Sequence, residues 1–290
     1  TLVRLEINGR LVLAPPGDTI YDAAKKAGIA IPALCSSDHL APFGSCRLCL
    51  CEVEGQSGLP ASCTTPVREG MVVHTESERL TRLRRNIVEL YLSEQPAGDR
   101  APESLQWLAK SLGLRQVRYP QPSHRLDVVD RSNPFFTFDN AACISCARCV
   151  RACDEIQGTH ALTMLHRGFA SSNCVSCGAC VKECPTGALM EKTVAEQGTP
   201  ERTVRTTCAY CGVGCAFNAG VRDSTVVRMV PADDGPSNQG HACMKGRFGW
   251  TYNYAPDRLR VPLLRQGNKW VEISWPDALD RIAHEWVRLK

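Results

Sequence analysis

The chain opens with short stretches in which apolar and polar residues alternate, as in strands buried on one face. Asn8-Gly9 separates the first two stretches and is the strongest short hairpin signal. Thr19 is placed to cap a helix, Ile20–Ala27, that Gly28 ends. The strands expected here are Leu2–Ile7, Arg10–Leu13, Leu50–Glu54 and Met71–Thr75. We therefore expect a small sheet crossed by one helix.

Helical spacing replaces this alternation further along the chain. Ser77–Ser93 carries apolar residues at three- and four-residue steps behind a serine that can cap it, which predicts an amphipathic helix. Prolines, polar residues and one short helix, Glu103–Leu112, predict a connector that reaches Pro134. Later expected elements are strands at Phe217–Arg222 and Val226–Val230 and a helix at Asp277–Leu289.

Cysteine is the residue whose number sets this chain apart, with 17 among 290 residues and an ordinary apolar fraction of 43%. Thiols in such number are either paired in disulfides or bound to metal, since free thiols are open to unwanted oxidation. The N-terminal stretch has none of the features of a secretory leader, and Arg84-Arg85 lies inside a predicted helix, so it is no twin-arginine signal. We therefore expect a cytoplasmic, metal-binding protein.

Charge and hydropathy exclude two further classes. The net charge of +4 is small, and Lys and Arg are scattered among acids with no basic stripe, so we expect no nucleic-acid partner. No apolar run approaches the roughly 20 residues that a membrane span requires. We therefore expect no membrane span.

One cysteine spacing occurs twice between residues 143 and 184. Each copy reads Cys-x2-Cys-x2-Cys-x3-Cys, the bacterial ferredoxin run, in which three close cysteines hold one 4Fe-4S cluster and the fourth reaches the other. The expected ligands are Cys143, Cys146, Cys149 and Cys184 for one cluster, and Cys174, Cys177, Cys180 and Cys153 for its neighbour. Structural zinc prefers two well-separated ligand pairs, so these triplets disfavour zinc. Asp154 replaces the proline that often ends the run, whereas Pro185 is present.

The first block of cysteines has two on one loop and two distant ones. It resembles a plant-type 2Fe-2S site whose first gap is ten residues instead of four, with expected ligands Cys35, Cys46, Cys49 and Cys63. Cys51 is left over and is most simply a buried small hydrophobe, although it could replace Cys49 as a ligand. His39 lies in the loop, but Rieske ligation needs two histidines on one iron, so we expect a hydrogen-bonding role for it.

The third block has three close cysteines and a distant one. Its expected ligands, again suited to a 4Fe-4S cluster, are Cys208, Cys211, Cys215 and Cys243. Lys245 follows two residues later, in Met244-Lys245-Gly246-Arg247-Phe248. A lysine there is normally a solvated surface group, but it could carry positive charge to the cluster edge or to an anionic cofactor.

The order of these blocks resembles the N-terminal part of the catalytic alpha subunit of cytosolic NAD-dependent formate dehydrogenases, which are molybdopterin oxidoreductases. The resemblance covers the whole chain, and the first module is also similar to the large iron-sulfur subunit of complex I and to the diaphorase subunit of NAD-reducing hydrogenases. It implies an electron relay from a molybdenum or tungsten bis-pterin centre, where formate becomes CO2, towards a flavin subunit that reduces NAD. It also implies that Lys245 bridges the cluster of the third cysteine block to the pterin.

Two departures from that family bear on the prediction. Relatives usually carry a further cluster on a His-x3-Cys-x2-Cys-x5-Cys segment after the long helix, but Ser93–Leu112 contains no histidine or cysteine, so we expect that cluster to be absent. The pterin-binding domains and the metal-ligating Cys or selenocysteine would lie beyond Lys290. We therefore expect this chain alone to lack the formate-oxidising site and to need a catalytic molybdopterin domain or subunit and a flavin- and NAD-binding partner.

The predicted fold class is α+β. We expect a β-grasp 2Fe-2S ferredoxin-like domain at 1–78, a helical connector at 79–134, a bacterial double 4Fe-4S ferredoxin module at 135–195, and the N-terminal 4Fe-4S subdomain of a molybdopterin oxidoreductase at 203–290. One alternative is a stand-alone electron carrier or diaphorase-type subunit of a hydrogenase, which has no reason to keep Cys208–Phe248. The other is a zinc-stabilised scaffold, which metal analysis of the purified protein would distinguish.

Overall fold

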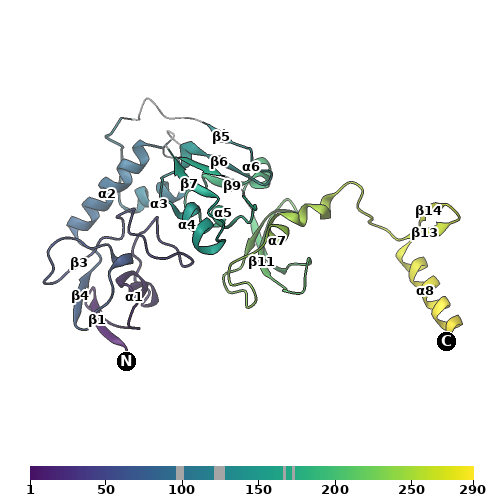
Figure 1. Ribbon diagram of the computed structural model, residues 1–290, viewed down its shortest axis with the longest axis horizontal. Helices are drawn as coiled ribbons and strands as arrows, with labels where there is room; N and C mark the ends of the chain where they lie inside the picture. The colour runs from purple at the N-terminus through teal and green to yellow at the C-terminus, as the bar shows by residue number, and fades with distance from the viewer. Residues whose placement is uncertain (96–100, 121–127, 166–167, 172–173) are drawn as a thin grey trace. The chain divides into compact units, whose positions relative to one another are not determined.

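The computed structural model describes residues 1–95, 101–120, 128–165, 168–171 and 174–290. These residues form two compact units, Thr1–Arg247 and Phe248–Lys290 (Figure 1). The boundary between the units falls inside the predicted module 203–290, whose extent stays a prediction. Within the described ranges, no helix combines the length and the apolar character that crossing a membrane requires.

The first module is a four-stranded sheet with one short helix, α1 (Ile20–Lys26), against it. The strands are β1 (Val3–Ile7), β2 (Arg10–Ala14), β3 (Glu52–Val53) and β4 (Met71–His74), in the order β2-β1-β4-β3. The central pair, β1 and β4, is parallel, and the outer pairs are antiparallel. Thr19 caps α1 and exchanges bonds with Asp22 in a capping box. The sheet, the helix and the first hairpin thus confirm the sequence pattern.

One strand is shorter than expected. The alternation predicted Leu50–Glu54, but only Glu52–Val53 pairs with β4. Leu50 instead forms an isolated bridge with Ala61, and the backbone N–H of Cys51 donates to Pro60 O at 3.1 Å. The start of the predicted strand is therefore paired with the loop that leads to Cys63.

Two helices connect the first and second modules (Figure 1). They are α2 (Glu78–Ser93), capped by Ser77, and α3 (Glu103–Ser111), and they pack against each other. Arg84 of α2 is buried and donates to the carbonyls of Leu48 at 3.0 Å and of Leu50 and Thr75 at 2.8 Å. This arginine fastens the long helix to the segment that carries Cys49.

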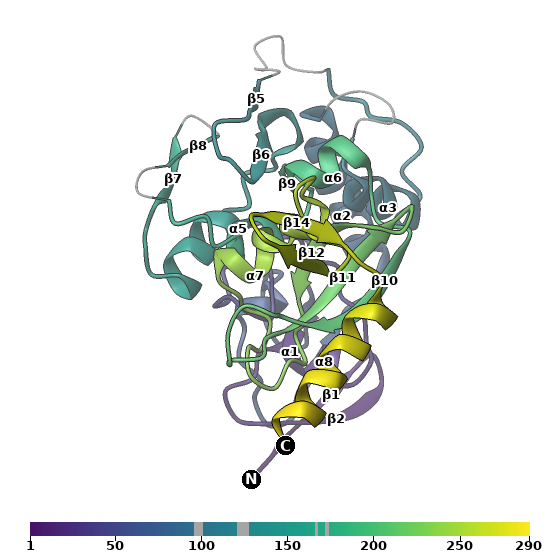
Figure 2. The ribbon, with the colours of Figure 1, turned by 90° about the vertical axis from the view of Figure 1, so that its right-hand side faces the viewer.

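The second module repeats one local structure twice. Its short helices α4 (Arg148–Arg151) and α5 (Ala179–Glu183) lie against each other, and a π-helical turn, Ala152–Ile156, extends α4. Three strands form the sheet β5-β6-β9, namely β5 (Val129–Asp130), β6 (Phe136–Asp139) and β9 (Leu189–Glu191). A separate hairpin, β7 (Leu162–Leu165) with β8 (Gly168–Ser171), lies between the two copies in sequence, and α6 (Lys192–Gln197) follows β9 (Figure 2).

The third block of cysteines flanks the strands of an antiparallel sheet along the sequence. Its strands are β10 (Arg202–Thr207), β11 (Ala216–Arg222) and β12 (Thr225–Pro231), and the boundary between the two units falls within a short helix, α7 (Met244–Phe248). The second unit contains the hairpin β13 (Leu263–Gln266) and β14 (Lys269–Glu272) and the helix α8 (Trp275–Leu289). This last helix begins two residues before the predicted Asp277, because Ser274 caps it and Trp275-Pro276 fills its first turn.

Candidate metal centres

The four cysteines of the first block meet in the interior of the first module. Cys35, Cys46, Cys49 and Cys63 are each at most 2% exposed. The Sγ atoms of Cys49 and Cys63 are 3.3 Å apart. The backbone N–H of Cys46 donates to Cys35 Sγ at 3.3 Å, and that of Leu34 donates to Cys46 Sγ at 3.4 Å. The structure therefore brings together all four predicted ligands of the 2Fe-2S cluster.

The thiols of this set shift one another's pKa values. Hydrogen bonds from Cys46 and Cys63 lower the pKa of Cys35, and a hydrogen bond from Cys63 lowers the pKa of Cys49 to about 6. The same bonds raise the pKa of Cys46 and Cys63, because those thiols act as the donors. Thiols this close can bind one compact cationic group as thiolates.

Neither of the other two candidates in this loop has the contacts of a ligand. Burial raises the pKa of Cys51 to about 12, and its thiol donates to Pro60 O at 3.6 Å. His39 Nε2 lies 3.0 Å from the carboxylate of Asp233, which is 194 residues away in sequence. These contacts support the prediction of a buried small side chain at Cys51 and of a hydrogen-bonding residue at His39.

Four of the repeated cysteines lie around one cavity in the combination that the crossed scheme predicts, and their ligation stays a prediction. Cys143, Cys146, Cys149 and Cys184 line one small cavity with apolar neighbours. Burial, followed by the charges of Cys146, Cys184 and Cys143, raises the pKa of Cys149 to about 12. The fourth thiol of the set thus comes from the second copy of the repeat.

The second set has the reciprocal arrangement. Burial, opposed by a backbone N–H bond, raises the pKa of Cys177, and the charges of Cys153 and Cys174 raise it further. Burial also raises the pKa of Cys180, and the next contribution comes from Cys149 of the other set. The two cysteine sets of this module are therefore immediate neighbours.

Backbone conformation is the same in the two copies. Ser145 and Ala147 have φ of +53° and +60°, and their counterparts Ser176 and Gly178 have +52° and +74°. The left-handed serines let their N–H groups donate to the cysteine two residues earlier, at 3.3 Å for Cys143 and 3.4 Å for Cys174. Successive N–H groups turned inward favour a negatively charged group.

The fourth cysteine of each set also receives hydrogen bonds. Cys153 Sγ accepts from the N–H of Ala161 at 3.2 Å and lies 3.2 Å from the Thr159 hydroxyl. Cys184 Sγ accepts from the N–H of Leu189 at 3.4 Å. Hydrogen bonds to ligand sulfur stabilise thiolates and are one of the factors that set the potential of a cluster.

The third set also comes together. The N–H of Cys208 donates to Cys215 O at 2.8 Å, and burial, followed by the charges of Cys208, Cys211 and Cys243, raises the pKa of Cys215. A Cβ atom at Gly246 would lie 3.3 Å from Cys208 Sγ and 2.9 Å from Phe217, so α7 packs closely on this set because it has glycine there. Lys245 is exposed, and its bridging role stays a prediction.

These donor sets fit iron-sulfur clusters. Each supplies the four thiols that such a cluster requires, and the first three also receive backbone N–H donors, which help to set a cluster's potential. Among the described residues, no three Cys, His, Asp or Glu side chains take up the arrangement that a single metal ion needs. When bound, the clusters would supply one-electron carriers, and the protein supplies the ligands and their spacing.

Two arginines of α4 join the first cysteine loop to the second module. Arg151 donates to Cys35 O at 3.3 Å and to Ala41 O, and Arg148 donates to Leu34 O at 3.5 Å. The sets share one hydrophobic cluster, which contains Cys35, Cys46 and Cys146. The first set and the Cys143 set therefore adjoin.

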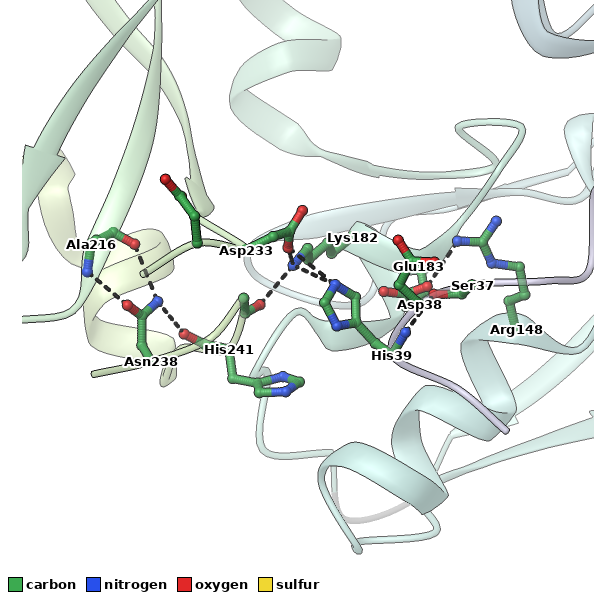
Figure 3. Close-up of polar contacts among 12 residues, drawn as sticks. Ser37, Asp38, His39, Arg148, Lys182, Glu183, Ala216, Asp233, Asn238 and His241 are labelled. Atoms are coloured by element: carbon green, nitrogen blue, oxygen red, sulfur yellow. Dashed lines mark hydrogen bonds and ion pairs between the residues drawn. The ribbon is translucent and has the colours of Figure 1, made fainter. Parts of the chain in front are cut away.

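A polar junction joins all three cysteine-bearing modules (Figure 3). Lys182 of α5 contacts His39 from the first module and Asp233 and Gly240 from the third. Sequence reasoning missed this junction and the two arginines of α4, because their partners are 51 to 143 residues distant and no local pattern marks them. The cysteine spacings, by contrast, indicate four candidate ligand sets, which stay predictions.

Comparison with known families matches three parts of the chain. Residues 1–78 match a 2Fe-2S iron-sulfur cluster binding domain, residues 142–188 a 4Fe-4S dicluster domain, and residues 201–255 the Fe4S4 domain of molybdopterin oxidoreductases. Each match contains one of the cysteine blocks described above.

Curated relatives cover nearly the whole chain. The alpha subunit of an NADPH-Fe(3+) oxidoreductase of Geobacter sulfurreducens is 36% identical over 91% of this chain and 33% of its own length. The mitochondrial 78 kDa subunit of an NADH-ubiquinone oxidoreductase of Candida albicans is 31% identical over 99% of this chain and 42% of its own length. The chain thus spans less than half of the length of either relative.

A solved structure also resembles the chain. One chain of an NAD+-reducing [NiFe]-hydrogenase in the H2-reduced state is 30% identical, with a TM-score of 0.59, over 66% of this chain and 87% of that one. The thiol geometry, the three domain matches and this structural likeness agree. The chain belongs to the iron-sulfur oxidoreductase proteins that combine a 2Fe-2S cluster binding domain with 4Fe-4S cluster domains.

Proposed function

We propose that this chain is the iron-sulfur electron relay of a formate dehydrogenase, with electrons entering at the Cys208 set and leaving at the Cys35 set. The observation that carries the proposal is the contiguity of the four thiol sets within one compact unit. Arg151 joins the first set to the Cys143 set, Cys149 and Cys180 join the two repeated sets, and Lys182 joins α5 to the loop before Cys243.

The chain's own residues would hold the carriers, and the burial of the ligands decreases from the first set to the Cys208 set, in which Cys211 and Cys243 are exposed. The thiols of the first set are buried, and those of the repeated sets are buried or half-buried except Cys174. Backbone N–H groups donate to the sulfur of predicted ligands in the first and second modules. Differences in burial and hydrogen bonding between sets give different potentials, as a chain of one-electron carriers requires.

The partners proposed at the two ends of the relay are suggested by the proteins and families that the chain resembles. Proteins named NADPH-Fe(3+) oxidoreductase and NADH-ubiquinone oxidoreductase match over more than nine-tenths of this chain, which supports a nicotinamide-linked partner. A flavin in that partner and its place at the 2Fe-2S end belong to the proposal. The match of residues 201–255 to a molybdopterin oxidoreductase domain supports a pterin-bearing domain or subunit at the other end. Lys245, exposed beside the Cys208 set, would face that pterin centre.

A second candidate is an adaptor or diaphorase-type subunit of an NAD-reducing hydrogenase. The likeness to a chain of such a hydrogenase favours it. The Cys208 set favours the formate dehydrogenase proposal, because a simple adaptor has no use for a molybdopterin oxidoreductase cluster domain.

The experiment that tests the proposal uses the anaerobically reconstituted chain with and without candidate catalytic polypeptides. The expected result is reduction of its clusters by formate only when a pterin-binding polypeptide is added, and onward transfer to NAD only with a flavin polypeptide. Formate oxidation by the chain alone, or reduction by hydrogen through hydrogenase subunits but never by formate, would contradict it.

A further inference from the structure

The ammonium group of Lys182 has two acceptors from the third module and lies beside the His39 ring of the first. It donates to the Asp233 carboxylate and to Gly240 O at 2.8 Å, and it lies 3.3 Å from His39 Nε2. The Lys182 side chain is 13% exposed. Figure 3 shows these contacts converging on one nitrogen between α5 and the two loops.

The residues in contact all lie within cysteine-bearing segments. Lys182 is between Cys180 and Cys184, which the crossed scheme assigns to different clusters. His39 lies between the first two predicted 2Fe-2S ligands, and Gly240 is three residues before Cys243. One side chain therefore touches the ligand-bearing loops of both neighbouring modules.

Glycine at position 240 makes this contact possible. Its φ is +81°, and a Cβ atom there would lie 2.6 Å from Lys182 Nζ and 2.7 Å from Asp233 Oδ1. The following segment is held to β11 by Asn238, whose side chain accepts from Ala216 N at 2.8 Å and donates to His241 O at 2.9 Å. The loop before Cys243 is thus fixed at one end by β11 and at the other by Lys182.

We propose that Lys182 is a positioning residue that sets the electronic coupling between the Cys174 set and the Cys208 set. The inference rests on the proposed relay and adds the device that fixes the spacing of two of its carriers. The rate of electron transfer between two clusters falls steeply with the distance between them. A loop held at Gly240 O and Asp233 would therefore keep the cluster of the Cys208 set within electron-transfer distance of the cluster of the Cys174 set. Because Asp233 is 69% exposed, the ion pair adds little to global stability.

The test compares variants of the full chain, reconstituted anaerobically. Lys182→Met removes the ammonium group. Gly240→Ala adds a methyl group that would push against the Lys182 ammonium from the third module, and Lys182→Arg keeps a cation. Lys25→Met is the matched control, because Lys25 lines the same pocket but pairs with Asp38, whose side chain is 69% exposed. The readouts are iron content, EPR of the fully reduced protein, and the rate of electron equilibration between clusters after rapid mixing with a reductant.

We expect Lys182→Met and Gly240→Ala to keep their iron. The EPR signal of the Cys208 cluster should lose its spin-spin broadening in both variants, and electrons should equilibrate between the clusters at least tenfold more slowly. Lys182→Arg should restore much of the broadening, and Lys25→Met should match wild type. Unchanged broadening and rate in Lys182→Met, equal losses in Lys25→Met, or loss of iron from Lys182→Met would overturn the inference. Failure of wild type itself to show four reducible clusters would instead contradict the relay.

Discussion

Replacing Arg84 with methionine should destabilise the first module, which carries the first cysteine loop, far more than replacing its neighbour Arg85 with methionine. Arg84 is 5% exposed, and its guanidinium donates to the carbonyls of Leu48, Leu50 and Thr75. Leu48 and Leu50 flank the predicted ligand Cys49. Arg85 is the matched control, because it is on the exposed side of α2 and donates once, to Leu112 O at 3.0 Å.

The magnitude follows from the hydrogen bonds that are lost. A hydrogen bond to a charged donor contributes about 1.5–3 kcal/mol, and a buried carbonyl left without its donor costs about 1–3 kcal/mol. Methionine keeps much of the buried aliphatic volume, so the loss is mainly polar. We expect Arg84→Met to lower the free energy of unfolding of the first module by about 3–5 kcal/mol, and Arg85→Met by under about 1 kcal/mol.

The assay is a urea titration of the anaerobic, cluster-loaded protein, followed by the visible circular dichroism of the 2Fe-2S centre. Arg84→Met should lose this signal at a clearly lower urea concentration than wild type, while the 4Fe-4S absorbance changes later. Equal midpoints for Arg84→Met and Arg85→Met would refute the view that Arg84 holds the loop around Cys49.

Three further predictions address other parts of the molecule. Cys184→Ala should disturb the cluster held by Cys143, Cys146 and Cys149, because Cys184 completes that set; loss of only the Cys174 signal in EPR would show that the ligation is not crossed. Thr159→Val removes the hydroxyl 3.2 Å from Cys153 Sγ. Since a donor to sulfur favours the reduced cluster, the potential of the Cys174 cluster should fall by about 20–60 mV in a redox titration, and an unchanged potential would mean that the hydroxyl does not donate to that sulfur. The hydrogen bond from Arg118 holds the pKa of the Glu89 carboxyl below its ordinary value of 4.5, so this pair stabilises the fold above that pH and ceases to do so as the pH falls through the lower, folded pKa. The difference in urea midpoint between wild type and Glu89→Gln should therefore shrink as acid is added, and a constant difference would contradict the assignment.

Much of the fold follows from local signals in the sequence. The Asn8-Gly9 hairpin, the Thr19 cap and the amphipathic pattern of Ser77–Ser93 each act over a few residues, and the structure confirms all three. The predicted strand Leu50–Glu54 was too long, because pairing of Leu50 with Ala61 depends on a loop eleven residues away. Alternation along a strand cannot indicate which partner it will find.

The candidate site divides in the same way. Cysteine spacing indicates the four candidate ligand sets, because cluster ligation imposes fixed short separations. The groups that join the sets had no such signal: Lys182, Arg148 and Arg151 look like ordinary surface charges until the chain folds. Their partners His39, Asp233 and Cys35 come from other modules, and only the three-dimensional structure brings them together.

The cluster inventory of the anaerobically purified full chain tests the central claim most directly. Mössbauer spectroscopy combined with iron and sulfide analysis should find one 2Fe-2S and three 4Fe-4S clusters, about fourteen iron atoms per chain, all reducible in a potentiometric titration. A colourless, zinc-rich protein, or one with only one or two clusters under strict exclusion of oxygen, would contradict the relay.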